Sequence, residues 1–258
     1  MGIKYYRNNL SGDINVPEVK YDCYDRTNWI DTNGLVLYLD AGNSKSYPGS
    51  GTTWTGLSGL SDNGTLVNGV GYNSANGGSL VFDGTNDYVS IPLSTSLNKT
   101  QGTMNFWVYP TRYNGSNGYF VNRDDSTANA VDWLWIGTYS DTFYFRLGNG
   151  SDCCSNDLTF SSVSSVIPLN SWTNMCFTWV SNGTSAIYKN GTLYTSRSIG
   201  NVPSTNPSLT GRIGLGHGGN GDEYFAGRIS NTSIYNRALS AAEIQQNYNA
   251  LKSRFGLP

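Results

Sequence analysis

The chain carries little charge for its size. Asp, Glu, Lys and Arg make up 13% of its 258 residues, and the formal net charge is −2. Ordinary globular proteins have about 25% charged residues. No basic run occurs, so we expect no nucleic-acid partner. No apolar stretch reaches the length of about 18 residues that a transmembrane helix needs, so we expect no membrane span.

Histidine and cysteine are also rare, with one histidine and four cysteines. The spacing of Cys23, Cys153, Cys154 and Cys176 matches no zinc template. The N-terminus lacks the apolar segment of a signal peptide, so we expect synthesis in a cytoplasm and free thiols. His217 stands in a glycine-rich loop, which disfavours the nucleophile and base pairs that most hydrolases use.

Glutamate is scarce as well, and this bears on glycoside hydrolysis. The reaction needs two carboxylates about 5–10 Å apart. The three glutamates are Glu18, Glu223 and Glu243, and none stands in a Glu-x-Asp-x-x-Glu arrangement. We therefore expect no enzyme and keep a glycoside hydrolase as the disfavoured alternative.

Aromatic residues and turn-forming residues are abundant. Aromatics make up 13% of the chain, and Asn-Gly pairs, which favour tight turns, recur along it. The segments between these turns have strand character, and the predicted strands are 35–39, 79–83, 87–91, 104–109, 133–136, 142–147, 172–180, 185–189, 212–215 and 228–235. Many short strands punctuated by turns predict an all-β sandwich or barrel.

The C-terminal segment predicts one short helix. Ser240 stands three residues before Glu243, which is the spacing of a capping box. Ile244, Tyr248 and Leu251 follow at helical spacing and give one apolar stripe. We therefore expect a helix over residues 241–252 that follows the last strand.

Residues 1–33 read as an N-terminal arm, and residues 34–258 read as the sandwich. The arm has little strand alternation but is rich in aromatic residues, namely Tyr5, Tyr6, Tyr21, Tyr24 and Trp29. These side chains either pack along the sandwich or dock on a partner, and the sequence leaves both alternatives open.

Several segments resemble laminin-G-like domains of the concanavalin A-like superfamily, in the same order along the chain. They are the hairpin 78–92, the strand 105–110, the strand pair 171–179 and 187–191, and the closing segment 225–258. The closing segment and residues 34–43 are similar to versions found in bacteriophage structural proteins. The resemblance implies a jelly-roll sandwich of two antiparallel sheets with a short C-terminal helix.

The resemblance also implies a function. We expect a non-enzymatic virion protein, either a capsid decoration or a tail-associated adhesin, made in the host cytoplasm and displayed on the virion surface. Its expected partners are other virion proteins and cell-surface or environmental polysaccharide, and we expect an oligomer in the assembly. A free carbohydrate-binding lectin is the alternative.

Loops of this fold bind calcium or glycans in many members. No cofactor is required here, but calcium is the candidate metal, with Asp40, Asp83, Asp87 and Asn231 as its ligands. In the closing strand, Ser230 and Asn231 stand where the family usually has aspartates, which weakens that site. For glycans, the candidate side chains are Trp54, Tyr113, Tyr119, Trp133 and His217, although packing within the protein would also explain them.

Overall fold

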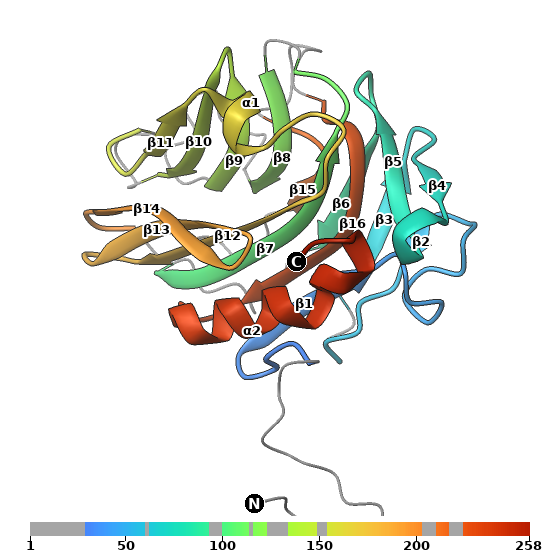
Figure 1. Ribbon diagram of the computed structural model, residues 1–258, viewed down its shortest axis with the longest axis horizontal. Coiled ribbons are helices and arrows are strands. Elements are labelled where there is room, and N and C mark those ends of the chain that lie inside the picture. Colours follow the sequence, from blue (N-terminus) through green and yellow to red (C-terminus); the bar gives the residue numbers. More distant parts are fainter. Residues whose placement is uncertain are drawn as a thin grey trace, which may run out of the picture.

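The structure is a sandwich of two antiparallel β-sheets, as the sequence predicts. The computed structural model describes residues 29–59, 62–92, 100–113, 116–122, 134–148, 154–202, 210–216 and 224–258. In Figure 1 the two sheets face each other, and the C-terminal helix lies on the outer side of one of them.

Sheet A, which carries that helix, has eight strands. In spatial order they are β14 (Thr192–Ser198), β13 (Thr184–Lys189), β12 (Thr173–Val180), β7 (Gln101–Pro110), β16 (Ala226–Tyr235), β5 (Ser79–Asp83) and β4 (Gly71–Asn73), with β1 (Leu35–Asp40) also paired to β16. The long strand β16 bonds to β7 along one side and to both β5 and β1 along the other. Strand β16 therefore brings distant parts of the chain together.

Sheet B also has eight strands. In spatial order they are β11 (Leu158–Ser161), β10 (Thr142–Leu147), β9 (Leu134–Tyr139), β8 (Ser116–Asn122), β15 (Thr210–Ile213), β6 (Tyr88–Pro92), β3 (Gly64–Val67) and β2 (Thr53–Trp54). The remaining short elements are η2 (Ala75–Gly77) and α1 (Val163–Val166). None of the helices in the described ranges is both long and apolar enough to cross a membrane.

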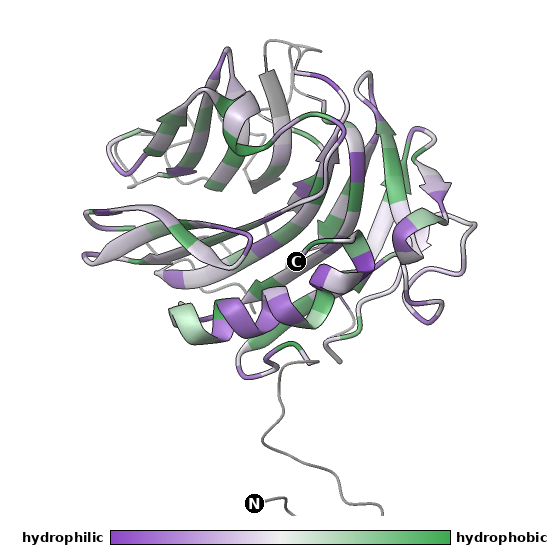
Figure 2. Cartoon of the chain, in the orientation of Figure 1, coloured by the Kyte–Doolittle hydropathy of each residue, from purple (hydrophilic) through white to green (hydrophobic). Residues whose placement is uncertain are grey.

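Strand β10 illustrates why these residues form a half-buried sheet. Phe143, Phe145 and Leu147 are buried, while the residues between them are partly exposed. This period of two places one face of the strand against the core and the other toward solvent. In Figure 2, apolar residues accordingly gather on the strands of both sheets.

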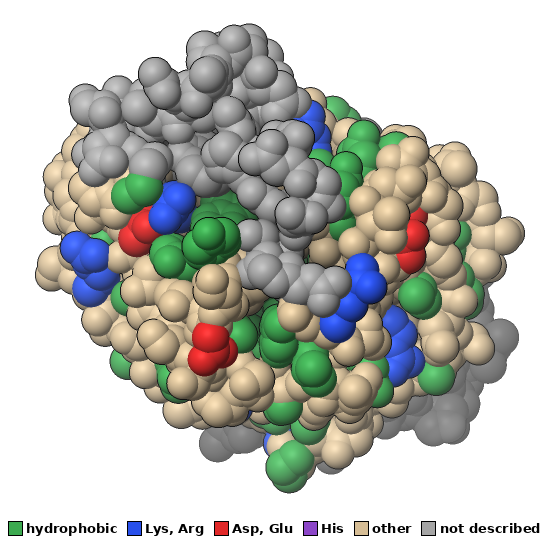
Figure 3. All heavy atoms as spheres, turned by 90° about the horizontal axis from the view of Figure 1, so that it is seen from above, with side chains coloured by type: hydrophobic (Ala, Val, Ile, Leu, Met, Phe, Trp, Pro, Cys, Tyr) green, Lys and Arg blue, Asp and Glu red, His purple; other side chains and the backbone are tan. Residues whose placement is uncertain are grey.

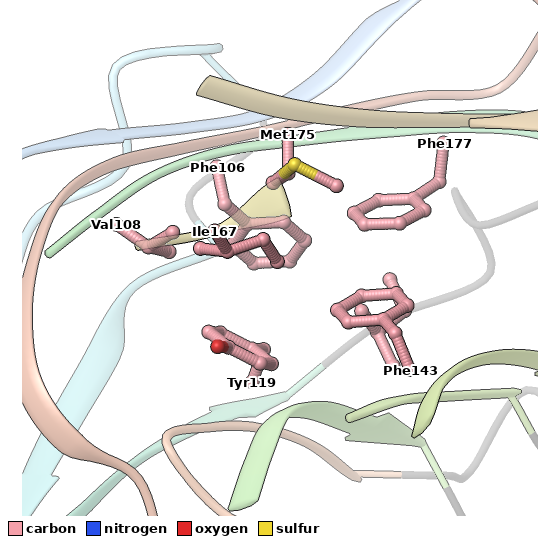
Figure 4. A pocket seen from close by; sticks show the side chains of 8 residues that line it. Phe106, Val108, Tyr119, Phe143, Ile167, Met175 and Phe177 are labelled. Atoms are coloured by element: carbon pink, nitrogen blue, oxygen red, sulfur yellow. The ribbon is translucent and has the colours of Figure 1, made fainter. Parts of the chain in front are cut away.

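The space between the sheets is filled by side chains. Phe177 of sheet A stacks on Phe143 of sheet B with ring centroids 5.6 Å apart, and Met175, Phe106 and Tyr119 lie beside them (Figure 4). The gap among these side chains is too narrow for a water molecule. Because the interior is packed at this point, it offers no room for a ligand.

The C-terminal helix begins and packs as the sequence predicts. Helix α2 (Ala241–Leu251) starts at a capping box formed by Ser240 and Glu243, and η3 (Lys252–Phe255) continues it. Hydrogen bonds from Arg237 lower the pKa of the Glu243 carboxyl from 4.5 to about 2. Ile244 and Tyr248 face the outer side of sheet A, so this sheet is covered on both faces.

One expectation from the sequence is wrong. Cys154 is disulfide-bonded, and its partner lies outside the described residues. Cys176 is a free thiol, as expected, and burial raises its pKa. The cysteines are therefore not all reduced, although their spacing gives no sign of a pair.

Candidate binding site

Asp83 and Asp87 belong to the turn between β5 and β6, where they bond to the backbone. Asp83 Oδ1 accepts a hydrogen bond from the Thr85 N–H at 2.7 Å, and Asp87 Oδ2 accepts one from the Asp83 N–H at 3.0 Å. Asp87 is buried, and this burial raises the pKa of its carboxyl. These contacts make the two aspartates part of the turn structure.

Asp40 is engaged elsewhere, so the structure does not assemble the predicted calcium site. Its Oδ1 lies 2.7 Å from Arg254 Nη1, and its Oδ2 accepts a hydrogen bond from the Tyr38 hydroxyl at 3.1 Å. Asn231 pairs with Asp40 in the register of β1 and β16 and is fully buried. In the part of the chain described, no group of three metal-binding side chains occurs. An arginine from η3 supplies the positive charge beside Asp40.

The predicted glycan-binding aromatics also need correction. Trp54 and Tyr119 are buried in the core and expose no ring face, because β2 and β8 turn them toward the space between the sheets. Tyr113 is partly buried, and its hydroxyl donates a hydrogen bond to the Ile167 carbonyl. Trp133 and His217 lie outside the described residues, so their role stays a prediction.

The described end of the N-terminal arm lies against helix α2. The Asp31 N–H donates to Asn247 Oδ1 at 2.6 Å, and Gln246 Nε2 donates to the Trp29 carbonyl at 3.0 Å. The Trp29 side chain itself is 75% exposed. The docking of Trp29 on a partner stays a prediction, as it does for Tyr5, Tyr6, Tyr21 and Tyr24, which lie outside the described residues.

A continuous row of aromatic rings crosses the outer face of sheet A. Its members are Tyr248, Trp107, Phe255, Trp172 and Tyr109, with neighbouring ring centroids 5.7, 4.1, 4.7 and 5.5 Å apart. The first rings are buried beneath α2 and η3, and Tyr109 at the other end is partly exposed. The row therefore leads from the packed helix interface to an accessible corner.

Arg228 occupies that corner. Its guanidinium carbon lies 3.8 Å from the centroid of the Tyr109 ring and 5.6 Å from that of Trp172. Arg228 and Tyr109 are directly opposite each other in the register of β16 and β7. A guanidinium held over an aromatic face has restricted freedom, which prepares it to bind an anion.

Gly227 allows the two strands to approach at this point. Its φ is +147°, and a Cβ there would lie 2.3 Å from the Tyr109 carbonyl oxygen. Any side chain would push β16 away from β7, so glycine at this position maintains the contact between Arg228 and Tyr109.

The surface seen from above carries its basic side chains apart from one another. In Figure 3 the Lys and Arg side chains lie in separate spots rather than in one continuous patch. A localised cation beside aromatic rings suits a small ligand group better than a long phosphate backbone, which requires many basic contacts.

Comparison with known proteins agrees with this architecture. Residues 83–245, more than half of the chain, match the concanavalin A-like lectin/glucanases superfamily. The chain belongs to this superfamily. A search of curated proteins gave no match.

Solved structures of the superfamily's fold include several toxin binding domains. The binding domain of Paraclostridial Mosquitocidal Protein 1 is 20% identical with a TM-score of 0.66, and the similarity covers 88% of this chain and 56% of that one. The ligand binding domain of botulinum neurotoxin serotype D, solved with N-acetylneuraminic acid, is 16% identical with a TM-score of 0.68, covering 88% of this chain and 55% of that one. The binding domain of botulinum neurotoxin DC, solved with rat synaptotagmin II, is 18% identical with a TM-score of 0.65, covering 86% and 52%. The chain thus spans about half the length of these structures.

The superfamily contains both lectins and glucanases. A glucanase needs catalytic carboxylates, so the positions of the glutamates are informative. Glu243 is bonded to Arg237 and Ser240 at the start of α2, and Glu18 and Glu223 lie outside the described residues. A catalytic carboxylate must reach the substrate, so the capping role of Glu243 makes it a poor general acid.

Sequence reasoning missed Arg228, Tyr109 and Trp172. Each looks ordinary in its own segment: Tyr109 and Arg228 lie within predicted strands, and Trp172 opens another. No pattern within either segment places Arg228 beside Tyr109, because their meeting depends on the register in which β16 pairs with β7.

Proposed function

We propose that this protein is a non-enzymatic, lectin-like binding domain carried on the surface of a bacteriophage particle, where it binds glycans. The concanavalin A-like fold and the toxin binding domains that share it support a binding role. The particle assignment rests on the resemblance of the closing segment 225–258 to phage structural proteins. Capsid decoration and tail-associated adhesion are both compatible with this proposal, and a free lectin is the alternative.

The observation that carries glycan binding is the accessible end of the aromatic row. Tyr109 is partly exposed beside Trp172, and Arg228 adds hydrogen-bond donors at the same point. Sugars are recognised by aromatic rings that pack against their C–H faces and by polar groups that fix their hydroxyls. This corner offers both kinds of group in one place.

Replacing Tyr109 with leucine tests this assignment. On a glycan array we expect the wild-type protein to bind at least one glycan, and Y109L to bind it about tenfold more weakly, because the ring beneath Arg228 is lost. The matched control is Y139L, since Tyr139 is 60% exposed at the end of β9, next to the turn that leads to β10. Absence of any glycan signal for the wild-type protein, with and without calcium, would refute the proposed function.

The face that carries the arm and α2 is the proposed attachment surface. Trp29 is largely exposed there. Two hydrogen bonds to helix α2 hold the nearby backbone: the Asp31 N–H donates to Asn247, and Gln246 donates to the Trp29 carbonyl. An exposed tryptophan on an anchored segment is typical of residues that become buried in protein interfaces. The neighbouring virion proteins would supply the second half of that interface.

Deleting residues 1–30 tests the attachment. We expect most of the particle-bound protein to be lost, because the deleted arm carries Trp29 and the other aromatic residues that are proposed to dock on the particle. W29A should reduce incorporation by a smaller factor. Quantitative blotting of purified particles measures this, and unchanged incorporation of the deletion variant would exclude an attachment role for the arm.

A further inference from the structure

We infer that Arg228 binds the carboxylate of an acidic sugar, so that the domain selects uronate- or sialate-type glycans over neutral ones. This inference rests on the proposed function and names the ligand class of the same site. It follows from a comparison of Arg228 with the other arginines of the molecule.

Three other arginines are each matched to a carboxylate. Arg146 lies 2.7 Å from Asp157, Arg237 lies 2.8 Å from Glu243, and Arg254 lies 2.7 Å from Asp40. Arg112 and Arg197 donate instead to backbone carbonyls. Among the described residues, no carboxylate or other acceptor lies within bonding distance of the Arg228 guanidinium.

Arg146 lies in a similar arrangement, in which the guanidinium also binds a carboxylate. Its guanidinium carbon lies 5.3 Å from the Trp135 ring and 5.2 Å from the Tyr144 ring, as Arg228 lies over Tyr109 and near Trp172. Arg146 Nε and Nη2 both donate to Asp157, at 2.9 and 2.7 Å. The two sites share a cation on a tryptophan–tyrosine pair, and they differ in that no described residue supplies a carboxylate to Arg228.

The unmatched site is accessible from outside. Arg228 and Tyr109 are partly exposed, so a ligand can reach the guanidinium N–H groups. A planar guanidinium has five N–H donors in a fork that suits two carboxylate oxygens. Its position over Tyr109 limits its motion, so less conformational entropy is lost on binding.

The aromatic rings favour a sugar acid over a simple anion. In a uronate or sialate, the carboxylate is attached to a pyranose ring, whose C–H groups can contact the exposed part of Tyr109 while the carboxylate meets Arg228. A neutral sugar would leave the charged donors without a matching anion, and a sulfate or an acidic peptide would lack the ring contact.

The test uses one polymer in two forms. Polygalacturonate and the same polymer with its carboxyl groups reduced to alcohols differ only in the group that Arg228 is proposed to bind. We expect the wild-type protein to bind polygalacturonate or sialyllactose about tenfold to a hundredfold more tightly than the reduced polymer or neutral lactose, because hydrogen bonds to charged groups are strong. Biolayer interferometry at constant ionic strength measures the ratio.

Three variants locate the effect. R228Q should bring the ratio of acidic to neutral binding to about one, because the charged donors that meet the carboxylate are lost. R228K, which keeps the charge but not the planar fork, should retain only part of the preference. K45Q removes the same charge from an exposed lysine of the loop after β1 and should change nothing.

The outcomes separate the inference from the proposed function. Binding of neutral glycans on the array without a preference for the acidic probes, or an unchanged preference in R228Q, would overturn the inference alone. If dextran sulfate or polyglutamate bound as tightly as the acidic glycans, and if that binding also depended on Arg228, the sugar-acid assignment would be overturned. Absence of binding to every glycan would overturn the proposed function together with the inference.

Discussion

Replacing Arg254 with methionine should lower the free energy of unfolding by about 3–5 kcal/mol, since removing one partner of a buried ion pair leaves the other charge uncompensated. Arg254 donates to Asp40 Oδ1 at 2.7 Å, to Ser230 Oγ at 2.7 Å and to the Gly78 carbonyl at 2.8 Å. Its Nε also donates to the Asn76 carbonyl at 2.8 Å. One side chain therefore connects η3 to β1, β16 and η2.

Asp40 is the group that makes the loss large. It is nearly buried, and without Arg254 its remaining partners are the Tyr38 hydroxyl and the Gly42 N–H. Burial and the Asp40 charge both raise the pKa of Tyr38, so this hydroxyl stays protonated and donates to the carboxylate. Those two donors do not compensate a full negative charge in a largely buried site.

Urea unfolding of R254M measures the effect, with the midpoint compared at an unchanged slope. The control is the double variant D40N/R254M, which removes the stranded charge. We expect it to be more stable than R254M alone, because part of the loss comes from the unpaired Asp40. A loss below about 1 kcal/mol in R254M would mean that the pair is solvated like a surface salt bridge.

The fold was largely predictable because its signals are local. The alternation of β10 and the capping box of α2 are patterns within a few residues, and both elements appear where the sequence predicts them. The missed elements have no such pattern. Strand β2 consists of Thr53 and Trp54 alone, and β14 is an edge strand whose residues are mostly exposed. Pairing with neighbouring strands, rather than an apolar period, defines them.

The site was less predictable because it depends on register between distant segments. Arg228 meets Tyr109 only because β16 pairs with β7 in one register, and that pairing shifts between Ile229 and Thr232. A slip of one residue would move Arg228 to the other face of the sheet. Asp40 shows the same dependence, because the arginine that neutralises it lies 214 residues away in the sequence. Residue type therefore suggested calcium, and the tertiary structure supplied an arginine.

Replacing Trp107 with alanine should also cost about 3–5 kcal/mol of stability, the range for removing a large buried aromatic side chain. Trp107 is fully buried, with its ring stacked 4.1 Å from Phe255 and 5.7 Å from Tyr248. The cavity would open between sheet A and the C-terminal helix, so the contact that holds α2 and η3 would weaken first. We expect W107A to become sensitive to proteolysis near its C-terminus at urea concentrations where the wild-type protein is intact.

W107F separates ring packing from hydrogen bonding. The Trp107 Nε1–H has no partner among the described residues, so phenylalanine loses part of the stacking area but no hydrogen bond. We expect W107F to lose less than half the stability that W107A loses, and to keep its C-terminus protected. Trp107 also supports Phe255, which contacts Trp172 at 4.7 Å beside the Arg228 corner. Carbohydrate binding should therefore weaken in W107A and persist in W107F, whereas equal binding by both variants would show that the Arg228 corner is held in place without the aromatic row.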